Sequence, residues 1–339
     1  MAHFALNQAK KTKNDEFYTQ LTDIQKELAH YKDQLKGKII FCNCDDPYES
    51  NFFKYFAMNF NTLWLKRLIA TCYIGSSIAN KELSLFAHET SENKTTKVPH
   101  KIVINEVVDE NNDTAIDLQD VIISLTNNKR NTLTRLNGNG DFRSAECIEL
   151  LKEADIVVTN PPFSLFREYI AQLMEYKKKF LIIGNKNAIT YKEIFKYIKE
   201  NKLFTGYRAM TGGMWFTINA DWENYDKVIN WEKLKNVPSC WFTNLDVAKH
   251  HEFITLYKKY LFEEFPKYDN CDAIEVSKVV DIPMDYEWIM WVPITFIDKY
   301  NPEQFEILWL DDPTVERRWR WPDLNGKPIY RRIIIKRRK

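Results

Sequence analysis

The N-terminal part of the chain carries two spacings of apolar residues in turn. Within residues 15–36 the apolar positions follow a helical period, and they are Leu21, Ile24, Leu28, Tyr31 and Leu35. A short apolar run over 38–44 predicts a buried strand that stops at the Asp45-Asp46-Pro47 turn. An aromatic-rich helix is expected over 50–60 and a second apolar strand over 65–73. Strand, helix and strand in this order predict the start of a parallel α/β sheet.

The same pattern returns near residue 140, after a less regular stretch. Residues 75–139 are rich in Asn, Asp and Thr, and we interpret them as an insertion with a short hairpin around 101–108. Ser144 is expected to cap the helix that follows. The elements predicted next are a helix over 144–152, a strand over 155–159, a helix ending near 178, a strand over 180–184 and a helix over 191–201. Strand-like pieces at 214–218 and 240–243 complete a sheet of about seven strands.

The pattern therefore predicts an α/β fold with two domains. Residues 1–250 form the sheet domain, and 339 residues are enough to bury its core. Beyond residue 250 the composition shifts to Tyr, Pro, Asp and Trp in short elements, so a smaller second domain is expected over 251–339.

Composition excludes several classes of protein. Hydrophobic residues make up 45% and aromatic residues 14%, which is the composition of a globular chain. We find no apolar run of membrane-spanning length and no signal-peptide core, so we expect a cytoplasmic protein without membrane contact. The six cysteines include Cys42-Asn43-Cys44 but no paired Cys-x-x-Cys sets, and we expect reduced cysteines and no metal.

Positive charge is concentrated at the two ends of the chain. Residues 317–339 hold ten basic residues and one acid, whereas the whole chain has a net charge of +1. A second small cluster consists of Lys10, Lys11 and Lys13. Such separation fits a protein whose ends meet a polyanion, although a terminal run of this kind is as often a solvated tail. The interleaved Trp319, Trp321 and Tyr330, with 333–335 all Ile, indicate that the tail is partly ordered.

The candidate chemistry lies at the end of the 155–159 strand. There Asn160, Pro161, Pro162 and Phe163 follow at once, at the edge where open α/β sheets hold ligands. The exocyclic nitrogen of adenine is a poor nucleophile, and hydrogen bonds accepted from its N–H groups aim its lone pair at a methyl donor. The Asn160 side-chain oxygen and the Pro161 carbonyl supply two such acceptors, and the prolines fix that carbonyl.

Phe163 adds a flat face on which a base extruded from a duplex can stack. The alternative is a plain turn, since Pro-Pro is an ordinary strand breaker. The strand before the tetrapeptide and the amphipathic helix after it favour function. The tetrapeptide itself is also typical of enzymes that methylate cytosine, RNA bases or protein glutamine.

Several segments around the tetrapeptide resemble the EcoRI-type adenine-specific DNA methyltransferase family. The N-terminal segments that resemble it are 13–20, 41–47 and 50–56, which read KNDEFYTQ, FCNCDDP and SNFFKYF. The segments 140–144 and 155–169 follow, and 268–270, 292–296 and 301–305 are similar to the C-terminal half of that family. The resemblance runs from about residue 10 to 308 and is interrupted only by 75–139.

This resemblance implies a Rossmann-like class I methyltransferase fold with a DNA-recognition domain at the C-terminus. It also implies methylation of adenine N6 at a short site in double-stranded DNA, with base flipping, as part of a restriction-modification system with a separately acting endonuclease. The cofactor implied is S-adenosyl-L-methionine, which leaves as S-adenosyl-L-homocysteine. Its pocket is expected to consist of Tyr18, Thr19, Asn43, Cys44, Asp45, Asp46, Asp141, Phe142 and Asn160. Asp141 would accept from the cofactor's adenine, and residues 160–163 would hold the target base.

Two departures from the family pattern affect these expectations. No Gly-x-Gly turn follows the first strand, so Asp45 or Asp46 could instead cap the next helix. In the C-terminal half, Trp288 and Trp291 stand where the family has glycines. Either these indoles alter the surface that meets DNA, or they belong to the core, which is the commoner position of tryptophan.

For phosphate contacts the sequence offers both basic clusters. The residues expected to bind the DNA backbone are Lys10, Lys11, Lys13, Arg317, Arg318, Arg320, Arg331 and Arg332. Two rival hypotheses stay open at this point. One is an amino-methyltransferase for RNA or protein glutamine, and the other is a non-catalytic DNA-binding module on the same fold.

Overall fold

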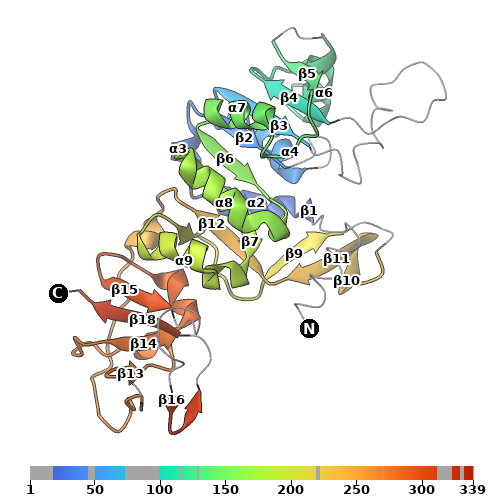
Figure 1. Cartoon of the computed structure of the whole chain (residues 1–339). Helices are drawn as coiled ribbons and strands as arrows, with labels where there is room; N and C mark the ends of the chain where they lie inside the picture. The colour runs from blue at the N-terminus through green and yellow to red at the C-terminus, as the bar shows by residue number, and fades with distance from the viewer. Residues whose placement is uncertain are drawn as a thin grey trace. The chain divides into compact units, whose positions relative to one another are not determined.

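A computed structural model of the chain describes residues 18–44, 50–72, 99–114, 116–127, 130–218, 222–269, 271–310, 323–328 and 332–338 (Figure 1). The chain divides into two compact units. The first holds residues 1–185 and 211–245, and the second holds 186–210 and 246–339. Because 186–210 belongs with the residues after 245, the division is not a single cut near residue 250.

The first unit is built on a large mixed sheet, to which it contributes seven strands within the described residues. Their order across the sheet is β5 (Thr132–Arg135), β4 (His100–Ile104), β3 (Arg67–Thr71), β2 (Ile39–Cys42), β6 (Ile156–Thr159), β7 (Lys179–Asn185) and β12 (Ser239–Thr243). Strand β8 (Phe204–Thr205) belongs to the second unit. The four strands β3, β2, β6 and β7 are parallel, whereas β4 pairs antiparallel with β3, and β12 with β7. Every residue of β2, β6 and β12 is buried, as expected of strands covered on both faces.

The described helices of the first unit are α2 (Leu21–Leu28), α3 (Lys32–Leu35), α4 (Asn51–Met58), α6 (Leu118–Asn127), α7 (Ala145–Glu153), η1 (Phe163–Leu165) and α8 (Phe166–Glu175). Helices α4, α7 and α8 lie where they were predicted, whereas α6 was not predicted. The predicted cap is confirmed, since the Ser144 side chain accepts from the Cys147 amide, and Ser50 caps α4 in the same way. Helix α8 packs closely on β7, because a Cβ at Gly184 would lie 2.4 Å from the ring of Phe166.

Two predictions in the N-terminal half are wrong in detail. The helix expected from residue 15 begins at Leu21, and Tyr18–Thr19 form strand β1 instead. Residues 101–108 do not fold back as a hairpin, because β4 lies between β3 and β5 in the large sheet. The described part of 75–139, from residue 99 on, therefore extends the sheet and carries α6. The partners of these strands lie far away in sequence, so local periodicity does not reveal them.

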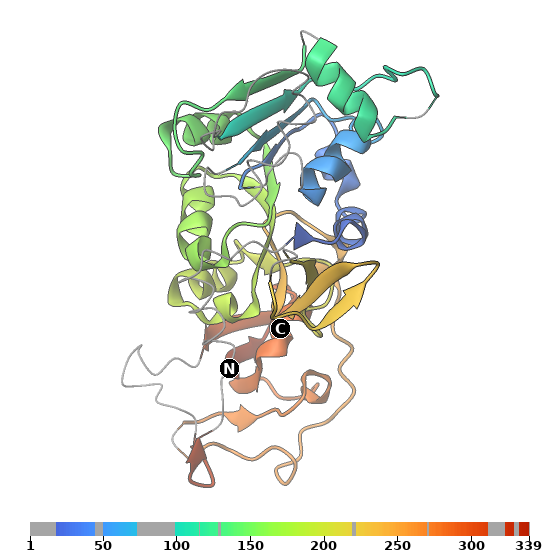
Figure 2. The ribbon, with the colours of Figure 1, turned by 90° about the vertical axis from the view of Figure 1, so that its right-hand side faces the viewer.

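A smaller antiparallel sheet also belongs to the first unit. Its order is β1 (Tyr18–Thr19), β9 (Met214–Thr217), β11 (Glu232–Val237) and β10 (Lys227–Ile229). The strand predicted at 214–218 is thus real but belongs to this sheet, not to the large one. Figure 2 shows its yellow strands standing out from the body of the unit.

The second unit has its own sheet. Its strands run in the order β13 (Ile274–Glu275), β14 (Met290–Pro293), β18 (Arg332–Arg337) and β15 (Phe305–Leu310). The other elements are η2 (Lys186–Thr190), α9 (Lys192–Lys199), η3 (Ala248–His251), η4 (Val279–Asp281), η5 (Ile294–Lys299), β16 (Asp323–Leu324) and β17 (Lys327–Pro328). Strand β18 is central, and its residues 333–335 are fully buried, which confirms that the basic tail is partly ordered.

No helix in the part of the chain that the structure describes has the length and apolar character needed to cross a membrane.

Candidate active site

Three strand ends meet at one edge of the large sheet. Since β3, β2 and β6 are neighbouring parallel strands, their carboxyl ends lie side by side. Asn43 follows β2 and Asn160 follows β6, and the Thr159 hydroxyl donates to the Asn43 carbonyl across the gap. At the end of β3 the loop of Gly140 lies so close that a Cβ there would sit 2.0 Å from the Cys72 carbonyl oxygen. Gly140, with φ +74°, is therefore required at this position.

The Asn160-to-Phe163 turn is firmly built into the sheet edge. Pro161 is buried, and Asn160, Pro162 and Phe163 are half-buried. Pro162 has φ −54° and ψ 122°, and its carbonyl accepts from the Leu165 amide at 2.9 Å as η1 begins. The two prolines and this bond fix the backbone carbonyls of the turn.

The ring of Phe163 contacts the small sheet. It meets Phe216 of β9 edge to face, with the ring centroids 6.4 Å apart and the planes at 79°. Phe216 in turn lies opposite Thr19 in the β1–β9 pairing. The small sheet thereby brings the N-terminal strand to the tetrapeptide turn, although the two are about 140 residues apart in sequence.

Strand β1 is fixed by two further side chains. The Asn51 amide, at the start of α4, donates to the Thr19 carbonyl at 2.7 Å, and Gln20 Nε2 donates to the Thr217 hydroxyl. Thr19 is therefore held against the N-terminus of α4, the helix that follows β2 in the chain.

Two buried polar atoms among these residues have no hydrogen-bond partner in the described structure. They are the Thr19 hydroxyl and the Asn43 side-chain nitrogen, on residues only 4% and 1% exposed. Buried polar groups in folded proteins are almost always paired, so an atom left over at a sheet edge indicates a ligand.

The loop at the end of β3 has a different character. Asp141 Oδ1 accepts from the amide and Nε of Arg143, and Oδ2 accepts from Arg143 Nη2 at 2.7 Å. These hydrogen bonds hold the pKa of Asp141 below its usual value, against an opposing effect of partial burial. Phe142 is buried edge to face against Tyr169, and its carbonyl accepts from Gln172 Nε2. The Asp141 carboxylate is thus ionised and already paired with Arg143.

One predicted phosphate contact has a different partner. Arg332 lies in β18, and its guanidinium forms an ion pair with Glu275, with the nearest atoms 2.6 Å apart. The two side chains are 19% and 3% exposed, so Arg332 serves the packing of the second unit, and we withdraw it from the phosphate-binding set. Several predicted site residues lie outside the described residues. They are the cofactor candidates Asp45 and Asp46 and the phosphate-contact candidates Lys10, Lys11, Lys13, Arg317, Arg318, Arg320 and Arg331.

The two tryptophans that depart from the family pattern differ in burial. Trp291 is fully buried and packs against Tyr268, with ring centroids 5.0 Å apart. Trp288 is 70% exposed. Only Trp288 can therefore change a surface.

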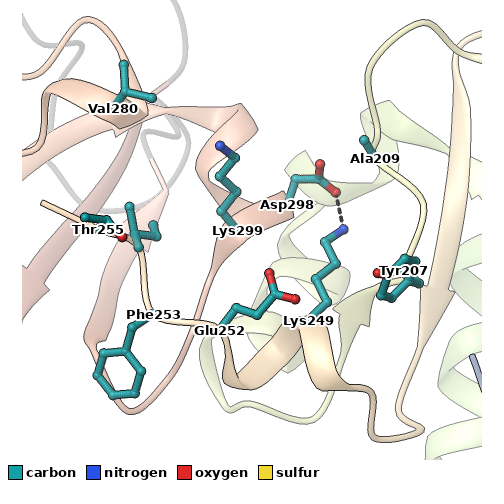
Figure 3. A pocket seen from close by; sticks show the side chains of 10 residues that line it. Tyr207, Ala209, Lys249, Glu252, Phe253, Thr255, Val280, Asp298 and Lys299 are labelled. Atoms are coloured by element: carbon teal, nitrogen blue, oxygen red, sulfur yellow. Dashed lines mark hydrogen bonds and ion pairs between the residues drawn. The ribbon is translucent and has the colours of Figure 1, made fainter.

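A groove in the second unit has no counterpart in the sequence reasoning. It encloses about 530 Å³ and is lined by both charged and aromatic side chains (Figure 3). On one wall Lys249 pairs with Asp298 at 2.7 Å and also donates to the Gly206 carbonyl. Glu252, Phe253 and Lys299 line the groove as well, and all three are exposed.

Within the described ranges no group of three or more His, Cys, Asp or Glu side chains is arranged to hold a metal ion.

Comparison with known proteins identifies the family. The family model described as "Adenine-specific methyltransferase EcoRI" matches residues 5–338, nearly the whole chain. The chain belongs to this family.

Curated relatives match the chain over most or all of their lengths. The chain is 45% identical to the Type II methyltransferase M.EcoRI of Escherichia coli, over 98% of this chain and 96% of that protein. It is 38% identical to the Type II methyltransferase M.MgeORF184P of Mycoplasma genitalium over the whole of both chains, and 37% identical to M.MpnI of Mycoplasma pneumoniae over 89% and 84%. No solved structure matches the chain.

Membership in the EcoRI family decides between the hypotheses left open by the sequence. The chain is an adenine-specific DNA methyltransferase of the restriction-modification class. A non-catalytic module and an enzyme for RNA or protein glutamine both disagree with a family model defined by adenine-specific methylation.

Sequence reasoning missed three residues that build this site. They are Phe216, Asn51 and Arg143, which contact Phe163, Thr19 and Asp141 respectively. Arg143 has a local signal, since it lies two residues from its partner. The other two depend on pairings across the fold and have none.

Proposed function

We propose that the chain transfers a methyl group from S-adenosyl-L-methionine to N6 of an adenine flipped out of double-stranded DNA. The observation that supports this best is the Asn160-to-Phe163 turn at the sheet edge, beside two buried polar atoms that have no protein partner among the described residues. The residues that would hold the cofactor are Tyr18, Thr19, Asn43, Cys44, Asp45, Asp46, Asp141 and Phe142, with Asn160 at its methyl end.

The cofactor's methionine part is assigned to the region of β1 and the end of β2. There the Asn43 side chain offers N–H groups and Thr19 offers a hydroxyl, and no described residue forms a hydrogen bond with either. When bound, S-adenosylmethionine supplies an electrophilic methyl group on a sulfonium.

The Asp141 loop is proposed for the cofactor's adenine. Each Asp141 oxygen already accepts from Arg143, so the carboxylate is held ionised and in one orientation. A carboxylate oxygen has capacity for a further donor, and the adenine amino group would take it. Phe142 is buried against Tyr169 of α8, and this contact would hold the loop in place.

Handling of the target base falls to the tetrapeptide turn. The Asn160 oxygen and the Pro161 carbonyl accept hydrogen bonds from the two N–H groups of the adenine amine. These two hydrogen bonds direct the lone pair of the nitrogen towards the methyl donor. Phe163 stacks on the base and is itself held at its edge by Phe216. The amine loses its proton after the transfer, so no strong general base is needed.

Contacts with the DNA backbone are assigned to the two basic clusters. We retain Lys10, Lys11, Lys13, Arg317, Arg318, Arg320 and Arg331 as phosphate-binding residues, each of which should contribute about one unit to the log–log salt slope of binding. A separately acting endonuclease completes the restriction-modification system.

Recognition of the target sequence is proposed for the second unit and its groove. Lys299 and Glu252 offer a donor and an acceptor in the same groove, and such pairs read the guanine and cytosine edges of a base pair in the major groove. Replacing Lys299 by Ala should then relax specificity at one base pair by about 1–3 kcal/mol. The Lys249–Asp298 pair keeps the wall of the groove in place.

The deciding experiment is product analysis. DNA from cells that express the chain is sequenced for modified bases, and the methylated nucleoside from a duplex containing the site is identified by mass spectrometry. N6-methyladenine is expected. N4-methylcytosine, or activity on RNA rather than on duplex DNA, would refute the proposal.

A further inference from the structure

The β10–β11 hairpin of the first unit has an unusual turn. Asn230 and Trp231 connect the two strands, and both have positive φ, 48° and 66°. A two-residue turn with two positive φ angles normally carries Asn-Gly, because glycine takes the second position without strain. Here a tryptophan occupies that position. Trp231 is 98% exposed.

Neither the fold nor the local packing accounts for this tryptophan. An indole in water contributes nothing to the core, and its left-handed backbone is strained. The residues next to it are also apolar and open, with Val228 and Ile229 of β10 49% and 47% exposed. The tip of the hairpin is therefore a large apolar wedge that the described residues of the first unit leave exposed.

Positive side chains flank the wedge on both strands. The Lys227 ammonium lies 3.7 Å from the centre of the Trp215 ring, and the Lys233 ammonium lies 5.2 Å from that of Tyr225. Cation–π contacts hold these lysines along the ribbon rather than leaving them free. The one acid beside the tip, Glu232, accepts a hydrogen bond from the Thr217 hydroxyl. An apolar tip with an ordered lysine on each strand fits DNA, whose stacked bases lie between two phosphate backbones.

The hairpin is joined directly to the target-base turn. Strand β11 pairs with β9, and Lys235 lies opposite Phe216, the residue whose ring contacts Phe163. Trp231, in the turn before β11, precedes Lys235 by four residues, or about 13 Å at strand spacing. Figures 1 and 2 show the ribbon projecting from the unit in two perpendicular views. The wedge therefore belongs to the same small sheet as Phe216, whose ring contacts the ring proposed to stack on the adenine.

Base extrusion creates the need for such a wedge. When an adenine leaves the stack, its neighbours lose a stacking partner. The lost stacking free energy opposes the extrusion of the base. An aromatic side chain that enters the gap restores the stacking. A tryptophan offers the largest flat surface of any side chain.

We propose that Trp231 inserts into the duplex beside the target adenine and stabilises the extruded state. This inference rests on the proposed function, because it requires a flipped adenine in duplex DNA. It adds a positioning residue that the tetrapeptide and the family resemblance do not supply.

The test uses a duplex that contains the methylation site with 2-aminopurine in place of the target adenine, because this base fluoresces when unstacked. The full-length protein should give a strong fluorescence increase. On this duplex we expect Trp231→Ala to reduce the extruded fraction about 10-fold. Because 2-aminopurine has no amino group at C6, the methylation rate is measured on the same duplex with adenine at the target, and it should also fall about 10-fold. Trp231→Phe should restore most of both.

The matched control is Trp64→Ala. Trp64 is also exposed, at 69%, and also has a positive φ, 52°, but it precedes β3 and so lies at the opposite edge of the sheet. We expect this variant to behave as the parent protein. Trp231→Ala should also unfold no more readily than the parent, which separates the proposed role from a structural one.

A second substrate sharpens the result. If the target adenine is mispaired, extrusion costs less, and the defect of Trp231→Ala should shrink. The inference is overturned if Trp231→Ala extrudes and methylates a paired adenine as the parent does, or if the variant changes only self-association. Failure of the underlying function looks different, since the parent protein would then leave adenine in duplex DNA unmethylated.

Discussion

Two buried polar clusters in this molecule follow opposite rules. One lies at the strand ends of the first unit, and the other surrounds Glu275 in the sheet of the second unit. At the strand ends the Thr19 hydroxyl and the Asn43 amide nitrogen have no hydrogen-bond partner among the described residues. The Glu275 carboxylate, by contrast, accepts several hydrogen bonds from neighbouring side chains.

The Glu275 cluster is a closed network. Arg332 donates through Nε and Nη2, and the Tyr268 hydroxyl donates to the second oxygen. Burial, together with the Glu275 carboxylate, raises the pKa of Tyr268. Every charge in the network has a partner, so it holds β13 and β18 together and leaves nothing for a ligand.

The difference teaches how to separate fold from function in this enzyme. A buried polar group that the chain itself satisfies contributes to stability, and its loss should appear in unfolding experiments. A buried polar group that the chain leaves over should appear in binding or catalysis. Three pairs of variants and one single variant test this comparison, and they are described from the largest expected effect to the smallest.

Asn160→Ala should have the largest effect. Removing the amide oxygen deprives the target amine of one acceptor, so the methylation rate constant should fall about 10³-fold. Cofactor and DNA binding should be retained, because the other eight cofactor residues and the phosphate-binding residues are unchanged. Single-turnover kinetics measures the rate, and calorimetry measures the binding. The control is Asn244→Ala, which removes an asparagine that bonds the Phe180 amide and the Lys178 carbonyl. That variant should lose stability and keep its rate, and equal losses of rate in both variants would contradict the assignment.

Arg332→Met should be the most destabilising change. It leaves the Glu275 charge buried without its main partner, which costs about 3 kcal/mol of unfolding free energy. Lys336→Met, at an exposed position of the same strand, should cost less than about 0.5 kcal/mol. Urea unfolding gives both values. The salt slope of DNA binding should be unchanged in Arg332→Met, and a slope lower by one unit would return this residue to the phosphate-binding set.

Thr19→Val and Thr243→Val form a sharp pair, because both residues are buried threonines. The Thr243 hydroxyl donates to the Phe180 carbonyl and accepts from the Leu245 amide, so its loss should cost about 1–2 kcal/mol of stability. Thr19→Val should leave stability unchanged and weaken S-adenosylmethionine binding about 5- to 10-fold. Thermal unfolding and calorimetry measure the two effects. A Thr19→Val protein that is destabilised and binds cofactor normally would rule out the cofactor role of this hydroxyl.

The smallest effect is a dependence on pH at Asp141. Its pKa is lowered in the folded state by Arg143, so its contribution to stability is present above the unfolded pKa of about 3.9 and is lost as pH falls through the folded value. Arg143→Met should remove this pH-dependent loss of stability. Near neutral pH the variant should melt about 1 °C lower than the parent. The effect is small because the Arg143 side chain is half exposed and water screens the ion pair. Melting temperatures from pH 7 down to pH 3 provide the measurement. Parallel curves for the parent and the variant would contradict it.

Much of the first unit was predictable from the sequence. The strands at 39–42 and 156–159 and the helices at 51–58 and 145–153 lie where periodicity and caps indicated them, because each is long enough to show its own pattern of buried positions. The tetrapeptide turn was also predictable, since its residue types determine its backbone and its acceptors.

What the sequence could not show are pairings between distant segments. Tyr18–Thr19 is a strand of two residues, too short for any period, and it exists because β9, some 200 residues later, supplies its partner. The contact of Phe163 with Phe216 and the hairpin that carries Trp231 follow from the same sheet.

Arg332 illustrates the same limit for charge. By sequence it belongs to a basic tail suited to phosphate, and only the register of β18 beside β14 and β15 puts it near Glu275. The sequence by itself determined the chemistry available at the active edge, because residue type decides which atoms donate, accept or stack. The tertiary structure decided which of those atoms the fold consumes and which it leaves for ligands, because that depends on neighbours that only long-range packing brings together.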